Sequence, residues 1–183
     1  MDFVSVFKFL IENFEKQKID FAVIGGIALF AAGIARATRD IDLLILSKDK
    51  ERIKAMMQGA GYELIHESDD VLNFCSDKVE LGRVDFLLAH RKYSLAMLDR
   101  AEKKEIIEGK FKIKVLRAED QIGLKVQSSS NDPLRLRQDM ADIEALIKSN
   151  YSRLDLKLLR EYFALFDREE ELTEIIKGIE NAK

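Results

Sequence analysis

Apolar side chains along this chain repeat with two different periods. Up to about residue 117, short apolar runs rich in β-branched and aromatic residues alternate with helical repeats, whereas from Glu119 onward the spacing is helical. This order predicts an α+β protein. We expect a mixed β-sheet core flanked by helices in residues 1–117, with a helical subdomain in residues 118–183 packed on the core.

Turn and capping residues divide these repeats into elements. Asp132 followed by Pro133 predicts a helix start, because Asp caps a helix and Pro fits its first position. The expected strands are 21–24, 40–46, 62–65, 71–75, 84–88 and 110–116. The expected helices are 2–16, 27–35, one between Ser47 and Gly61, 94–107, one from 119, one from 132, 155–166 and 168–180.

Two carboxylates interrupt the apolar strand expected at 40–46. Residues i and i+2 of a strand point to the same face, so Asp40 and Asp42 project side by side while Ile41 faces the core. Burying such a pair without a partner would cost several kcal/mol each. A divalent cation removes this cost, and Mg²⁺ (or Mn²⁺) prefers carboxylate, water and phosphate oxygens.

Two further features of the sequence fit a site beside Asp40 and Asp42. Asp85 lies within the apolar run RVDFLLAH, so a strand beside 40–46 would bring a third carboxylate to the pair. Gly25 and Gly26 separate an apolar strand from the next helix, where a bare backbone lets a phosphate approach. Each feature alone has an ordinary structural explanation, a tight turn for the glycines or a salt bridge from Arg36, Arg39 or Arg83 for the aspartates. Their joint order favours a site for metal and phosphate.

Composition narrows the class of protein. The net charge of −3 does not indicate a nucleic-acid binder as a whole. The lone cysteine, Cys75, excludes an internal disulfide and fits a reducing cytosol. The uncharged run 21–35 is too short to cross a bilayer. We therefore expect a cytoplasmic protein that does not contact a membrane.

Together these residues resemble the signature of DNA polymerase β-like nucleotidyltransferases: Gly25-Gly26, a spacer, Asp40-Ile41-Asp42 and a later Asp85. Arg36 and Thr38 before the aspartates resemble the R-x-T-x-D-x-D form of the AbiEii/AbiGii abortive-infection toxin branch. Farther along, the residues that match this branch best are Lys125, Arg137 and Asp139. The resemblance covers roughly residues 20–147.

The resemblance implies an activity and a set of roles. The enzyme would move a nucleoside monophosphate from a nucleoside triphosphate to an acceptor, as in a minimal nucleotidyltransferase. Asp40, Asp42 and Asp85 would be catalytic and would bind the metal ions. The triphosphate would be held by Gly25, Gly26, Thr38, Arg36, Lys125, Arg137 and Asp139. Lys125 and the surface pair Arg135–Asp139 also fit plain solvated helix positions.

The acceptor and the partners stay open at this point. The toxin-like branch and a lysine-rich stretch, Lys110 to Arg117, suggest RNA, in particular a tRNA 3′ end, and a cognate antitoxin as partner. The same lysines fit a strand edge guarded against aggregation. Two other interpretations compete: a D-x-D phosphatase, which leaves the Gly-Gly pair unexplained, and a non-catalytic nucleotide-binding module that retains the fold.

Overall fold

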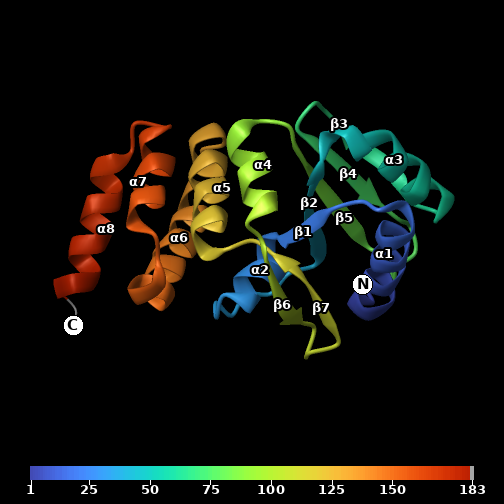
Figure 1. Ribbon diagram of the computed structural model, residues 1–183, viewed down its shortest axis with the longest axis horizontal. Coiled ribbons are helices and arrows are strands. Elements are labelled where there is room, and N and C mark those ends of the chain that lie inside the picture. Colours follow the sequence, from blue (N-terminus) through green and yellow to red (C-terminus); the bar gives the residue numbers. More distant parts are fainter. Residues whose placement is uncertain (182–183) are drawn as a thin grey trace. The chain divides into compact units, whose positions relative to one another are not determined.

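The computed structural model describes residues 1–181 of the chain (Figure 1). Two compact units can be distinguished. The first comprises Met1–Ala31 and Arg36–Leu116, and the second comprises Ala32–Ala35 and the chain from Arg117 onward. The predicted domain boundary after residue 117, with the helical subdomain packed on the core, stays a prediction. No helix among the described residues is both long and apolar enough to cross a membrane.

The first unit is built on a seven-stranded mixed sheet in the order β3-β4-β5-β2-β1-β7-β6. The pairs β2–β5 and β1–β7 are parallel, and the other neighbours are antiparallel. This confirms the predicted α+β class. The strands are β1 (Phe21–Ile24), β2 (Asp40–Leu46), β3 (Glu63–Glu67), β4 (Val71–Cys75), β5 (Arg83–Ala89), β6 (Glu102–Ile106) and β7 (Phe111–Val115).

One face of this sheet carries the hydrophobic core. The alternating side chains of β2, Ile41, Leu43 and Ile45, are fully buried on it. Two helices, α1 (Phe3–Gln17) and α3 (Lys50–Gly59), contribute their apolar stripes to the same cluster. Because every second residue of a strand faces this core, the residues between them are left to the opposite face. That opposite face holds the candidate site.

The remaining helices of the first unit are short. The helix α2 (Gly25–Ala31) follows β1 directly, so the two glycines are its first residues rather than a separate turn. The 3₁₀ turn η1 (Ser47–Asp49) precedes α3, and α4 (Lys92–Asp99) follows β5. Both α2 and α4 lie against the central strands of the sheet.

The second unit is helical, as predicted. It consists of α5 (Ala118–Asn131), α6 (Leu136–Asn150), η2 (Tyr151–Arg153), α7 (Leu156–Ala164) and α8 (Glu169–Asn181). Its core contains the close contact between Gly123 and the ring of Tyr162, where an added Cβ would lie 2.8 Å from a ring carbon. The Tyr162 hydroxyl donates a hydrogen bond of 2.6 Å to buried Asp120, so the ring's polar tip is satisfied.

Three predicted elements differ from the structure. The helix expected at 94–107 ends at Asp99, and β6 follows, because pairing with β7 outweighs the helix propensity of its charged residues. The helix expected from Asp132 begins at Leu136, since Asp132 instead accepts a bond from the Leu134 amide in a turn. The helix expected at 27–35 ends at Ala31.

Candidate active site

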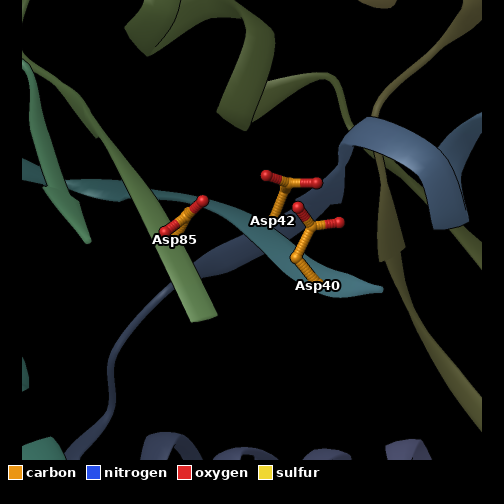
Figure 2. Close-up of side chains that lie close together, drawn as sticks. All are labelled: Asp40, Asp42 and Asp85. Atoms are coloured by element: carbon orange, nitrogen blue, oxygen red, sulfur yellow. The ribbon is translucent and has the colours of Figure 1, made fainter. Parts of the chain in front are cut away.

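Three aspartates gather on the face of the central strands opposite the hydrophobic core. Asp40 and Asp42 lie on β2 and Asp85 lies on β5, and Figure 2 shows their carboxylates pointing toward one another. One oxygen from each carboxylate lies within 4.8 Å of the other two. All three side chains are half-buried, so a small ligand reaches them from solvent.

Strand register explains why residues 43 positions apart in the sequence meet. The strands β2 and β5 run parallel, and Asp42 is the direct partner of Asp85. Paired residues on neighbouring strands point to the same face. Ile41 and Val84, the pair beside them, are fully buried on the core face. The alternation that buries the apolar residues therefore places the carboxylates together.

Arg83 stands beside this cluster on the same strand as Asp85. Its Nε donates to both carboxylate oxygens of Asp85, at 3.0 and 2.9 Å. This hydrogen bond raises the pKa of the Arg83 guanidinium, and the charges of Asp85, Asp40 and Asp42 add to the effect. About half of its side chain is exposed, so it offsets only part of the carboxylate repulsion.

Gly25 allows Asp42 to lie against the backbone. Its φ is +63°, and a Cβ built there would lie 2.0 Å from a carboxylate oxygen of Asp42. Any other residue at this position would collide with the aspartate and also adopt a left-handed conformation that side chains disfavour. The first glycine is therefore required by the carboxylate cluster itself, in addition to any approach of phosphate.

Gly26 has a different neighbour, Thr38. A Cβ on Gly26 would lie 2.6 Å from the Thr38 Cβ and 2.7 Å from its hydroxyl oxygen. The Thr38 hydroxyl donates a hydrogen bond of 2.6 Å to Asp40 Oδ1, with the Asp40 carbonyl at 3.3 Å. A hydroxyl has one proton to donate. While that proton is given to Asp40, Thr38 cannot donate it to a phosphate oxygen.

The other residues predicted to bind nucleotide belong to the loop before β2 and to the helical unit. Arg36 lies half-buried in the loop between α2 and β2, close in sequence to Thr38. Lys125, Arg137 and Asp139 lie in the helical unit, where Arg137 is exposed. The Lys125 ammonium contacts Asp139 at 3.0 Å and Asp142 at 2.6 Å. To reach a phosphate, it would have to leave both carboxylates, and its nucleotide contact stays a prediction.

The ligand set fits a hard divalent cation. Three carboxylates offer only oxygen donors, which suit Mg²⁺ or Mn²⁺ rather than metals that prefer sulfur or imidazole. Three like charges this close repel one another, and the guanidinium of Arg83 within hydrogen-bonding distance of Asp85 offsets one of them. An acidic cluster of this kind, on a mixed sheet beside a Gly-Gly helix start, resembles the nucleotidyltransferase signature expected from the sequence.

Comparisons with known proteins give the same class. The chain belongs to the family described as "Nucleotidyl transferase of unknown function (DUF2204)", which matches residues 4–180. It is thus a nucleotidyltransferase, an enzyme class that transfers a nucleoside monophosphate. The more specific AbiEii/AbiGii branch stays a prediction. A search of curated proteins gives no sequence match.

Solved structures with similar folds come from the same class. The antibiotic-resistance factor ANT(2'')-Ia has a TM-score of 0.63 at 16% identity, covering 97% of this chain and 99% of that one. The lincosamide antibiotic adenylyltransferase LnuA has 0.56 at 18%, covering 78% and 94%. A putative nucleotidyltransferase of Thermotoga maritima has 0.51 at 12%, covering 78% and 96%. At these identities the likeness concerns the fold.

Proposed function

We propose that this enzyme uses Asp40, Asp42 and Asp85 to hold divalent metal ions and transfers a nucleoside monophosphate from a nucleoside triphosphate to an acceptor hydroxyl. The observation that supports it most strongly is the convergence of three carboxylates from two register-matched strands. When bound, the metal neutralises charge on the triphosphate and on the reacting oxygens. Positioning and charge neutralisation are the main contributions of a protein to phosphoryl transfer.

The roles of the chain's own residues follow from their places. Asp40 and Asp42, on one strand, are the primary ligands, and Thr38 fixes the orientation of the Asp40 carboxylate. Asp85 lies at the side of the pair away from α2, where it accepts the proton of the attacking hydroxyl. Gly25 and Gly26 present backbone without side chains next to these carboxylates, which supports a triphosphate site there.

The nucleotide is tested by its effect on thermal unfolding. A ligand that binds only the native state stabilises it, by about 2.7 kcal/mol at a hundredfold excess over Kd. Mg²⁺ with a nucleoside triphosphate should raise Tm, and Asp42→Asn should abolish most of that rise. Asp2→Asn is the matched control, because Asp2 is an exposed helix cap on α1 and Asn also caps helices. An equal rise in both variants would contradict the site.

The acceptor has two candidates. The similar folds include an adenylyltransferase named for lincosamide antibiotics and ANT(2'')-Ia solved with adenylyl-2''-tobramycin, which supports a small acceptor. An RNA 3′ end, with a toxin–antitoxin role, is the second candidate and rests on the lysines of β7. Lys112 lies exposed within the strand, Lys110 precedes it, and Lys114 is paired with Asp20 at 2.7 Å. The ion pair removes part of the free positive charge that RNA would need.

A further inference from the structure

The polar face of the sheet continues beyond the aspartates onto β4 and β3. Asn73 of β4 is the direct partner of Asp85, and His66 of β3 is the partner of Asn73. Paired residues share a face. Two parallel polar rows therefore cross four strands: Asp42, Asp85, Asn73 and His66 in one, and Asp40, Arg83, Cys75 and Glu63 in the other.

Folding alone does not explain Asn73 and His66. Asn is disfavoured within strands, and its neighbours Leu72 and Phe74 are fully buried on the other face. Neither the Asn73 amide nor the His66 ring forms a hydrogen bond or ion pair with another residue in the part of the chain that the structure describes. Asn73 is half-buried and His66 is exposed, so both can bind a ligand from solvent.

The position of this row relative to Asp85 suits an acceptor. Neighbouring strands lie about 5 Å apart, so Asn73 is about 5 Å and His66 about 10 Å from Asp85 across the sheet. The opposite flank of the aspartates is occupied by β1 and the glycines of α2, where we place the triphosphate. Within this unit, a molecule that offers a hydroxyl to Asp85 from the other side therefore extends over β4 and β3.

The charge of this face indicates the class of acceptor. Neither β3 nor β4 contains a lysine or arginine, and Arg83 already donates to Asp85. The lysines of the sheet lie at its other end, on β6 and β7, beyond β1. A nucleic-acid backbone is bound through several cations. Asn73 and His66 instead offer hydrogen-bond donors and acceptors, which match hydroxyl groups.

We propose that Asn73 and His66 form the acceptor subsite, and that the acceptor is an uncharged molecule rich in hydroxyl groups. This inference rests on the proposed function. One acceptor hydroxyl oxygen forms a bond to the α-phosphorus of the triphosphate as the bond from that phosphorus to pyrophosphate breaks. The hydroxyl proton passes to the Asp85 carboxylate, and pyrophosphate leaves. Ile65, 52% exposed at the bulge of β3, adds an apolar contact beside the row.

The test measures pyrophosphate release from nucleoside triphosphates and Mg²⁺ with two kinds of probe. The first is myo-inositol or glucose at high concentration, and the second is an oligoribonucleotide with a free 3′ hydroxyl. The polyols should accelerate release and give a product heavier by one nucleoside monophosphate. Asn73→Leu and His66→Leu should each lower kcat/KM for the polyol by about threefold to tenfold, the loss expected for one hydrogen bond between uncharged groups.

Controls separate a binding role from a structural one. His66→Gln keeps a donor and an acceptor, so it should retain most of the transfer lost in His66→Leu. Asn13→Leu is the matched control, because Asn13 lies on α1, which packs on the opposite face, and donates a hydrogen bond to the Phe9 carbonyl of its own helix. The Tm rise with Mg²⁺ and triphosphate should stay the same in all these variants.

Three outcomes would overturn the subsite. If the oligoribonucleotide accelerates pyrophosphate release and the polyols do not, the proposed class of acceptor is wrong. The same conclusion holds if neither probe accelerates release. Unchanged polyol transfer in the Asn73→Leu, His66→Leu double variant would remove the two residues from the site. Failure of the proposed function gives a different result from failure of the subsite. In that case Mg²⁺ and triphosphate raise Tm equally in wild type and Asp42→Asn, or they raise it in neither.

Discussion

At the scale of single residues, the hydroxyl of Thr38 has one measurable task, to hold the Asp40 carboxylate. Thr38→Val keeps the side-chain shape but removes the hydrogen bond of 2.6 Å. We expect Mn²⁺ affinity, measured by calorimetric titration, to fall by about tenfold or more, as for other groups that orient metal ligands. Thr38→Ser keeps the hydroxyl and should retain most of the affinity.

The same experiment separates two roles of Thr38. If the threonine instead donates to the triphosphate, Thr38→Val would leave metal affinity in the absence of nucleotide unchanged and would raise the KM for the triphosphate. If it only fills the space left by Gly26, Thr38→Val would leave the metal affinity unchanged, whereas Thr38→Ser would lower it, because serine lacks the methyl group. Either result would contradict the positioning role.

At the scale of elements, α5 and α6 are joined by an ion cluster. Lys125 lies between Asp139 and Asp142, which are 0% and 7% exposed, and Arg135 reaches Asp139 at 3.3 Å from the solvent side. Lys125→Met would leave two buried carboxylates without their shared ammonium. We expect the free energy of unfolding in urea to fall by about 3–5 kcal/mol.

Lys148→Met on α6 is the control for this change, since Lys148 is exposed and its loss should alter stability by about 0.5 kcal/mol at most. The Lys125→Met variant also tests the predicted contact between Lys125 and the nucleotide. If Lys125→Met still folds at low temperature and binds the triphosphate with wild-type affinity, the lysine serves the helix pair alone. A loss of affinity in the folded variant would support the nucleotide contact.

Sequence alternation predicts some of these elements and not others. Asp40, Asp42 and Asp85 interrupt apolar strands, so the period of two is enough to assign their face. The same rule applied to Asn73, between Leu72 and Phe74, also indicates a polar face, but an uncharged side chain gives a weaker signal. The strand β6 could not be predicted, because its charged sequence forms a strand only through pairing with β7.

Side-chain contacts between residues of different elements could not be predicted from the sequence either. The hydrogen bond from Thr38 to Asp40 and the contact of Gly25 with Asp42 depend on how a loop folds back, which periodicity does not encode. Arg83 was visible only as a possible ion-pair partner, and register with β2 is what places it at the cluster. The site residues were thus predictable by type and face, and their mutual contacts were not.

At the scale of the whole molecule, the chain passes between its two units more than once. Residues Ala32–Ala35 belong with the helices although both their neighbours in sequence belong with the sheet, and Asn150 of α6 donates to the Ala32 carbonyl at 3.4 Å. We predict that cleavage at a protease site inserted between Leu116 and Arg117 will leave the two fragments together in gel filtration. If the two fragments separate without denaturant, the contacts of residues 32–35 with the helical unit are too weak to hold the fragments together.

The alignment of β2 with β5 also has a practical use. Seven consecutive residue pairs are matched along these strands, and a slip by one would bring Val84 or Phe86 beside Asp42 and bury Asp85 in the core. A molecule with this slip therefore lacks the cluster of three carboxylates. In a refolded preparation, the number of metal ions bound per chain would count the molecules whose central strands found their correct neighbours, and it could serve as a quality control that needs no substrate.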